Sequence, residues 1–385
     1  MSQAAPAQAA PRGDAPAAAP AAGPRGVLDH DAYRAQRYFP ALDGVRAVAV
    51  MLVFTVHVKY EDFWKHFAGG NGVTMFFVLS GFLITTLALR EEGRRGALSL
   101  RSFYIRRLFR IYPTYFGVLA LYCVLIYGAG FVPERRGLFS DQLPYYVLGF
   151  PEHGYFGLKG IESGPPFAAA WSIGIEEKFY LVWPLLGFVF LRGRFRARIA
   201  ACVIAAVCCV TAPSLWDGGV YLREYVFIVI GVMLALALHE RRWYDRLRLL
   251  ASRGVVLATF AALAALQVAG VLDEQPVRVL DGILVAVALA GIVMSARSDT
   301  AWLRARPMVF LGQVSYVFYL THNFALNFVE KTPLGKQTLL WSFADVIVAF
   351  PLAVLIAWAI HASFERPLTR VGHRLAHRDK PFHAV

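Results

Sequence analysis

Long apolar stretches alternate with short polar ones along most of this chain. A helix needs about 20 mostly apolar residues to cross a membrane, because each residue adds only about 1.5 Å. Ten stretches reach or approach that length, and the fifth is the shortest. They are 39–58, 72–90, 111–130, 170–191, 199–213, 221–239, 254–272, 277–296, 308–329 and 340–363. The pattern predicts an all-α polytopic membrane protein, with about ten transmembrane helices in one bundle.

The two ends of the chain depart from this pattern. Residues 1–37 are rich in Ala and Pro, and a low-complexity stretch of this kind is typical of a disordered tail. It has no apolar core of the kind that a secretory signal needs. We therefore expect a disordered tail over 1–37, a membrane domain over 38–366 and a basic tail over 367–385.

Arginine clusters predict the orientation of the bundle. Short loops rich in Lys and Arg remain on the cytoplasmic side of a membrane. Such clusters follow every second predicted span, at residues 90–110, 192–198, 241–248, 297–306 and 366–378. The loops between these clusters hold far fewer basic residues. With an even number of spans, both termini are expected in the cytoplasm.

The composition agrees with a membrane protein. Hydrophobic residues make up 57% of the chain and charged residues 17%, whereas soluble domains average about 45–50% and about 25%. The net charge of +13 comes from the loop clusters, so it does not indicate a nucleic-acid partner. No CxxC pair or Cys/His metal spacing occurs, and we expect neither a disulfide framework nor a bound metal. The cysteines all lie in apolar stretches: Cys123, Cys202, Cys208 and Cys209.

The first predicted span carries two ionisable groups at different depths. Arg46 lies in its inner half and His57 near its outer end, about 16 Å apart along the helix axis. Asp43 precedes Arg46 by three residues and is a plausible ion partner on the same helix face. Ionisable residues within a span usually face the bundle interior or a cavity. Two simpler interpretations stay open: Arg46 extends toward the inner surface, and His57 is an interfacial residue without a role.

Two other spans place polar groups at a depth similar to that of His57. The fourth span carries Glu176 and Glu177, and the ninth carries His322. An imidazole with a carboxylate that orients it is the usual combination for general-base catalysis. A purely structural polar network between helices is the alternative.

A second group of candidates lies on the inner side. Arg106, Arg107 and Arg110 precede the third span, and guanidinium groups at this spacing can bind phosphates in a bidentate manner. Alternatively, these arginines only keep their loop on the cytoplasmic side of the membrane. Ser80, in the second span, is either a nucleophile or, more in keeping with its Ser-Gly context, a site of close helix packing. The chain has no P-loop, GxGxxG, HExxH or GxSxG motif.

Six stretches, in their order, resemble the acyltransferase 3 family of integral membrane enzymes. They extend from about residue 38 to 370 and read LDGVRAVAVMLVFTVH, NGVTMFFVLSGFLIT, SFYIRRLFRIYPTYF, WSIGIEEKFYLVWPLL, SYVFYLTH and FERPL. Members of this family modify surface polysaccharides, lipopolysaccharide, peptidoglycan and some antibiotics. The resemblance implies a multi-pass protein of the bacterial inner membrane.

The resemblance also implies roles for individual residues. The family's Arg/Lys-x10-His pattern falls on Arg46 and His57, and its RxxR pattern falls on Arg107 and Arg110. By resemblance, His57 is catalytic and the arginines serve a cytoplasmic acyl-CoA donor. Many members carry an acidic residue where this chain has Thr74.

This departure shifts the search for the partner of His57. Because Thr74 cannot act as a carboxylate, Glu176 or Glu177 becomes the candidate partner. A second departure is Lys178, where many members have Gln.

Together these features predict O-acyl transfer, with acetyl as the expected group, from acyl-CoA to a hydroxyl of a glycan or glycolipid. His57 is the expected general base, and His322, Tyr319 or Arg46 are candidates to stabilise the oxyanion. An acyl-histidine relay stays open. Acyl-CoA would be a substrate, and no permanently bound cofactor is expected. The alternatives are a transporter or flippase of a glycan or lipid-linked sugar, and a scaffold subunit that needs a partner protein.

Overall fold

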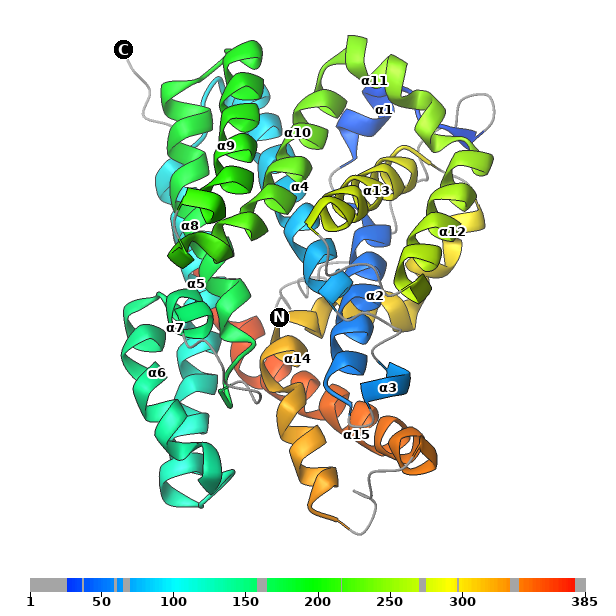
Figure 1. Cartoon of the computed structure of the whole chain (residues 1–385). Coiled ribbons are helices and arrows are strands. Elements are labelled where there is room, and N and C mark those ends of the chain that lie inside the picture. The colour runs from blue at the N-terminus through cyan, green and yellow to red at the C-terminus, as the bar shows by residue number, and fades with distance from the viewer. Residues whose placement is uncertain are drawn as a thin grey trace, which may run out of the picture.

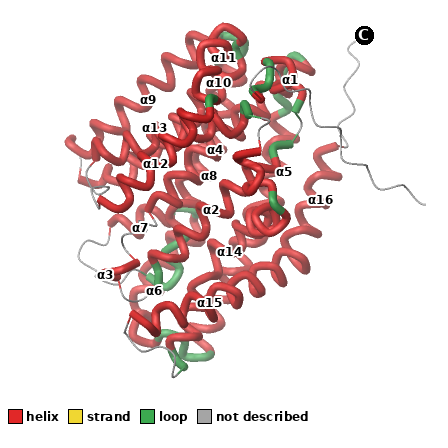
Figure 2. Tube along the Cα trace, turned by 90° about the vertical axis from the view of Figure 1, so that its right-hand side faces the viewer, coloured by secondary structure: helices red, strands yellow, loops and turns green. Residues whose placement is uncertain are grey.

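The structure is a computed structural model, and it describes residues 26–36, 38–58, 61–64, 70–157, 165–215, 217–269, 275–295, 298–332 and 339–377. Within these residues the fold is helical, and the extended backbone is limited to an isolated bridge between Val27 and Ser295. Figure 2 shows this arrangement as one bundle of helices. The predicted all-α class is confirmed for the described part of the chain.

Each of the ten apolar stretches forms a helix. The long helices are α2 (Pro40–Val56), α4 (Gly70–Arg95), α5 (Leu100–Cys123), α8 (Ala170–Leu185), α9 (Phe195–Leu215), α10 (Tyr225–His239), α12 (Arg253–Ala269), α13 (Gln275–Val293), α14 (Arg306–Glu330) and α15 (Leu339–Ile360). π-helical turns extend three of them, at Val124–Gly128, Leu186–Phe190 and His361–Glu365.

Shorter helices connect these elements. They are α1 (His30–Ala35), α3 (Glu61–Trp64), α6 (Arg136–Leu148), α7 (Pro151–Gly157), α11 (Arg241–Leu247) and α16 (Arg366–His377). Short 3-10 turns lie at Pro133–Arg135, Asp217–Glu224, Arg248–Ala251 and Ser298–Arg304.

The count of membrane spans is lower than the predicted number. Six helices in the described part are long and apolar enough to cross a membrane, or seven if the bent pair Arg241–Ala251 and Arg253–Ala269 counts as one span. The helices α2, α8 and α14 are not among them. The first two have only 17 and 16 residues, and all three carry the polar residues that the sequence singled out. About ten spans is therefore not confirmed, and the orientation of the termini stays a prediction.

Glycines bring the central helices into close contact. A Cβ atom on Gly312 of α14 would lie 2.0 Å from the carbonyl oxygen of Asp43 on α2, and one on Gly231 of α10 would lie equally close to the carbonyl oxygen of Val78 on α4. Small residues permit such approaches between membrane helices. As a result α14 lies beside α2 and α10 lies beside α4, and α2 and α4 also pack against each other (Figure 1).

The two predicted tails are described only in part. Residues 1–25 and 378–385 lie outside the described residues. The last part of the predicted N-terminal tail contains α1, which lies beside α11 in both views (Figures 1 and 2). The first part of the predicted C-terminal tail belongs to α16, which packs against α5.

Candidate active site

A cavity of about 320 Å³ opens among α2, α4, α5, α8 and α14. The α4 residues that line it repeat at the helical spacing of three and four, so they form one face of the helix. They are Val73, Phe76, Phe77, Leu79, Ser80, Leu83, Ile84 and Leu87. Its polar lining consists of Tyr38, Asp43, Arg46, Arg107, Arg110, Ser172, Glu176, Glu177, Tyr180, Ser315, Tyr316 and Tyr319. Five of the predicted site residues therefore share one cavity.

Exposure distinguishes the two ends of the cavity. Tyr38 and Leu87 are 55% and 46% exposed and mark its mouth, whereas Ser172 and Tyr319 are 6% and 7% exposed and mark its closed end. Val73 and Leu87 are separated by about 21 Å along α4, at about 1.5 Å per residue. The cavity is thus a shaft that is open at one end and closed at the other.

Arg46 is fixed by the ion pair that the sequence predicted. Its Nη1 atom lies 2.7 Å from Oδ1 of Asp43, and the hydroxyl of Tyr38 donates a hydrogen bond to the other carboxylate oxygen of Asp43. Asp43 is buried, so both of its oxygens need partners. The three side chains form a chain from the mouth of the cavity to its interior.

A second polar chain crosses the cavity from α8 to α4. The hydroxyl of Tyr180 donates to Oε2 of Glu176 over 2.5 Å, and it lies 2.8 Å from Oγ of Ser80. Because a tyrosine hydroxyl has one hydrogen, Ser80 is the donor to Tyr180 when Glu176 is ionised. The guanidinium of Arg107 lies over the Tyr180 ring, 5.3 Å from its centre. This chain holds a carboxylate and a cation within one wall of the shaft.

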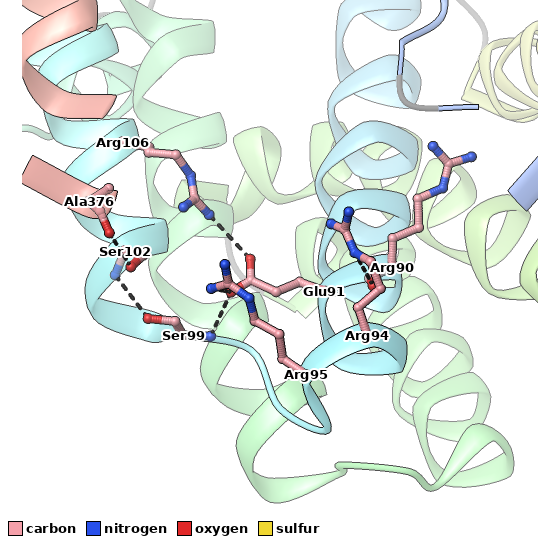
Figure 3. A network of polar contacts seen from close by, with 8 residues as sticks. All are labelled: Arg90, Glu91, Arg94, Arg95, Ser99, Ser102, Arg106 and Ala376. Carbon is pink, nitrogen blue, oxygen red and sulfur yellow. Dashed lines mark hydrogen bonds and ion pairs between the residues drawn. The ribbon is translucent and has the colours of Figure 1, made fainter. Parts of the chain in front are cut away.

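The arginine trio before the third span does not stay together. Arg107 and Arg110 line the cavity, whereas Arg106 reaches to α4 and its Nη2 atom lies 3.4 Å from Oε2 of Glu91. Figure 3 shows Glu91 among Arg106, Arg95 and the backbone N–H of Ser99, which donates to the same carboxylate over 3.1 Å. Arg106 therefore connects α5 to α4 outside the cavity.

Glu177 and Lys178 do not take part in the hydrogen bonds between Glu176, Tyr180 and Ser80. One carboxylate oxygen of Glu177 is buried without a hydrogen-bond partner among the described residues. Lys178 instead pairs with the fully buried Glu152 of α7, with 2.6 Å between Nζ and Oε1, and donates to the carbonyl oxygen of Gly149 over 2.8 Å. Lys178 thus ties α7 to α8.

The two predicted histidines lie next to each other. Nε2 of His322 is 3.3 Å from Nδ1 of His57, and the ring centres are 4.8 Å apart. His322 is buried and His57 is exposed at the end of α2. Within the described residues, neither Glu176 nor Glu177 hydrogen-bonds to either histidine. The sequence placed these groups at one depth, but it did not identify the two imidazoles as partners.

Backbone carbonyls fix the tautomer of both rings. Nδ1 of His57 lies 2.8 Å from the carbonyl oxygen of Val53, and Nδ1 of His322 lies 2.8 Å from that of Tyr319. A carbonyl oxygen only accepts, so each Nδ1 carries the hydrogen and each neutral Nε2 carries a lone pair. The Nδ1 hydrogen of His57 is then shared between the Val53 carbonyl oxygen and Nε2 of His322. Nε2 of His57 has no partner within the described residues and can accept a proton.

Tyr319 separates the shaft from the histidine pair. Its hydroxyl lies 2.7 Å from Oγ of Ser172, and its backbone carbonyl accepts the hydrogen bond from His322. Its ring packs edge-on against Phe76, with 5.9 Å between the centres. Neither histidine lines the cavity. The closed end of the shaft is therefore separated by the Tyr319 side chain from the buried imidazole of His322, with 6.3 Å between the two ring centres.

Sequence reasoning missed several members of this site. Ser172 and Tyr180 were not predicted, although they share a helix face with Glu176 at a spacing of four residues. Tyr38 was treated only as the start of the membrane part. The described residues contain no group of three or more His, Cys, Asp or Glu side chains that could hold a metal ion.

Comparison with known proteins assigns the chain to a protein family. The sequence profile described as an acyltransferase domain, that of the acyltransferase 3 family, matches residues 39–362. The chain belongs to this family. The match covers all five helices that line the cavity, so the shaft and the histidine pair lie inside the family domain.

Named relatives come from three bacteria. The chain is 37% identical to the peptidoglycan O-acetyltransferase OatA of Listeria monocytogenes over 164 residues, which cover 41% of this chain and 25% of that protein. It is 28% identical to the putative peptidoglycan O-acetyltransferase YrhL of Bacillus subtilis over 377 residues, which cover 91% and 58%. It is 23% identical to a putative O-acetyltransferase of Staphylococcus aureus over 366 residues, which cover 88% and 59%.

The chain therefore spans between a quarter and about three fifths of the length of these relatives. No solved structure matches it. The apolar helices and the family together identify a multi-pass membrane protein.

Proposed function

We propose that this protein is a membrane-bound O-acyltransferase that moves an acetyl group from cytoplasmic acyl-CoA to a hydroxyl of a glycan or glycolipid. The observation that carries the proposal is that the histidine pair lies just beyond Tyr319, which closes one end of a shaft lined by three arginines. A base and an anion-binding site at opposite ends suit a long, anionic thioester donor. The names of the relatives support O-acetyl transfer to a glycan.

The donor would enter at the mouth between Tyr38 and Leu87. Arg46, Arg107 and Arg110 line the shaft, and guanidinium groups bind phosphate oxygens with charge-assisted hydrogen bonds. The apolar face of α4 fits an extended pantetheine arm, whose thioester would point toward Tyr319. Rotation of the Tyr319 side chain away from Ser172 would bring the thioester to the imidazoles.

His57 is the proposed general base. Its Nε2 lone pair would take the hydroxyl proton of the acceptor as the oxygen attacks the thioester carbonyl carbon. The carbon–sulfur bond then breaks, and the CoA thiolate leaves along the shaft toward the arginines. His322 and the Val53 carbonyl keep the ring in the tautomer that this step needs. The carboxylates would serve the donor side, because the described hydrogen bonds connect Glu176 to Tyr180 and not to a histidine.

The test measures CoA release from acetyl-CoA by purified protein in nanodiscs, with peptidoglycan fragments and other glycans as acceptors. General-base catalysis contributes about 10²–10⁴ in rate, so His57→Ala should lower acceptor-dependent release by about that factor. The exposed His373 of α16 gives a matched control, His373→Ala, which should keep the wild-type rate.

Each other outcome has a distinct meaning. CoA release that persists in His57→Ala would show that His57 is not the general base, while the acyltransferase activity itself would stand. Absence of release and of acetyl-CoA binding in the wild type would contradict the enzyme and favour the transporter. Release that requires an added partner protein would favour the scaffold subunit.

A further inference from the structure

The residues that precede the family domain are anchored to the bundle. We use the term N-terminal segment for residues 26–36 together with Tyr38 and Phe39. The backbone N–H of Leu28 donates to the carbonyl oxygen of Met294 over 2.8 Å, and the hydroxyl of Tyr244 donates to the Leu28 carbonyl over 2.9 Å. Leu28 and Tyr244 are fully buried. These bonds attach the beginning of the segment to α11 and to the end of α13.

A histidine adds a third attachment. The Nε2 atom of His30 lies 2.9 Å from the carbonyl oxygen of His239 at the end of α10, and the ring of His30 packs on that of Tyr244 with 5.1 Å between the centres. Tyr33 is buried against the same Tyr244 ring. The segment is therefore packed into the bundle before it reaches the cavity.

Arg90 of α4 clamps the middle of the segment. Its Nη2 atom donates to the carbonyl oxygen of Tyr33 over 2.9 Å, and its Nη1 atom donates to that of Gln36. The guanidinium also lies over the rings of Tyr33 and Phe39, 5.5 and 4.9 Å from their centres. Figure 3 shows Arg90 extending away from the Glu91 network on the other side of α4. A planar guanidinium makes two carbonyl bonds and two ring contacts at once, which a lysine ammonium cannot reproduce.

The end of the segment forms part of the cavity mouth. Tyr38 and Phe39 both line the cavity, as does Leu87, which lies one turn before Arg90 on α4. The Tyr38 hydroxyl donates to Asp43, and Asp43 pairs with Arg46. Partial burial and the neighbouring Asp43 carboxylate raise the pKa of Tyr38 to about 12. The hydroxyl therefore stays protonated at neutral pH and remains a donor to Asp43.

We propose that the N-terminal segment is a functional part of the donor site, with Arg90 and Tyr38 as positioning residues. This inference rests on the acyl-CoA donor that we propose above. Arg90 holds the segment in place, the segment presents Tyr38 at the mouth, and Tyr38 fixes the carboxylate that orients Arg46. The chain of contacts thus links residues that precede the family match to an arginine inside the shaft.

The role of Tyr38 follows from the needs of a buried carboxylate. Arg46 satisfies one oxygen of Asp43 and Tyr38 satisfies the other. Without the hydroxyl, the carboxylate is free to rotate, and it can bind Arg46 through both oxygens. Arg46 would then be drawn toward Asp43 and away from the donor. The expected effect is a weaker affinity for the donor, with little change in the chemical step at the histidine pair.

The experiment compares two conservative variants, Tyr38→Phe and Arg90→Lys, with two matched controls. Tyr127→Phe removes an exposed hydroxyl that bonds to Ser140, and neither residue lines the cavity. Arg94→Lys makes the same change one turn after Arg90, at an exposed guanidinium. Each protein is purified in nanodiscs, and acetyl-CoA binding, KM for acetyl-CoA, kcat and Tm are measured.

We expect Tyr38→Phe and Arg90→Lys to raise the Kd and KM for acetyl-CoA about tenfold, the usual effect of losing a hydrogen bond to a charged group. The kcat should stay within about twofold, as for a loss of uniform binding, and both controls should match the wild type. Unchanged Kd and KM in both variants would reject the inference. So would a lower Tm and kcat at an unchanged KM, since that pattern describes a purely structural role.

The two proposals fail in different ways. A wild type that neither binds acetyl-CoA nor releases CoA would reject the proposed donor and this inference together. A wild type that binds acetyl-CoA, with variants that bind it equally well, would reject only the role of the N-terminal segment.

Discussion

The shaft and the histidine pair hold their polar groups in opposite ways. In the shaft, side chains satisfy one another: Asp43 bonds with Tyr38 and Arg46, and Glu176 bonds with Tyr180. At the histidine pair, backbone carbonyls orient both rings and leave one nitrogen lone pair without a partner in the described residues. The comparison suggests that the shaft binds charge, whereas the pair is prepared to accept a proton.

The strongest way to break this comparison is at the buried histidine. His322→Ala removes the imidazole that accepts from His57, so the His57 ring keeps only its bond to the Val53 carbonyl and can shift toward the space that the imidazole leaves. Misplacement of a catalytic group by about 1 Å can cost about 10²-fold. We expect kcat to fall by about that factor while acetyl-CoA binding is unchanged. Equal losses in kcat and in donor affinity would show that the two regions do not have separate roles.

The complementary variant changes the shaft and leaves the histidine pair intact, by removing one positive charge. Arg110→Met keeps much of the side-chain volume, and Arg110 lines the cavity from α5. Because hydrogen bonds to charged groups contribute about 1.5–3 kcal/mol, KM for acetyl-CoA should rise about tenfold or more. The kcat at saturating donor should change little. Arg106→Met, which lies outside the cavity, is the control, and an equal rise in its KM would contradict the division of the arginine trio.

The third variant weakens the hydrogen bond of Tyr319, the residue that separates the shaft from the histidine pair. Ser172→Ala removes the hydroxyl that holds the Tyr319 side chain at the closed end. A hydrogen bond of about 0.5–1.5 kcal/mol corresponds to a two- to tenfold shift in the open population. Acetyl-CoA hydrolysis without acceptor should rise by about that factor. A rate equal to that of the wild type would mean that Tyr319 is not the barrier.

The smallest expected effect concerns stability within the shaft. Tyr180→Phe leaves Glu176 and Ser80 without their shared partner, which costs about 1–3 kcal/mol. For domains of about 150–250 residues each kcal/mol lowers Tm by about 2–4 °C, so in this longer chain we expect a decrease of a few degrees at most, measured in detergent or nanodiscs. Tyr127→Phe serves again as the control. An unchanged Tm would show that the chain does not stabilise the bundle.

Much of the fold was predictable because it depends on local pattern. Every predicted apolar stretch forms a helix, since in apolar surroundings a helix satisfies its backbone hydrogen bonds within the segment, even where the stretch contains a proline. The Asp43–Arg46 pair was predictable for the same reason, because residues three apart share a helix face. The number of spans was not predictable, since α2 and α8 are apolar but have only 17 and 16 residues, and apolarity alone does not separate a spanning helix from one enclosed by its neighbours.

The order of residues was enough to predict the helices, the clusters of charge and the family. Which polar groups meet depends on how the helices pack against one another. This packing paired His57 with His322 and not with a glutamate, separated Arg106 from Arg107, and brought Tyr38 to Asp43. The physical reason is that helix periodicity fixes the face on which a side chain lies. The side chain that it meets is fixed by the packing of helices from distant parts of the chain. Close glycine contacts, such as that between Gly312 of α14 and the backbone of α2, set that packing.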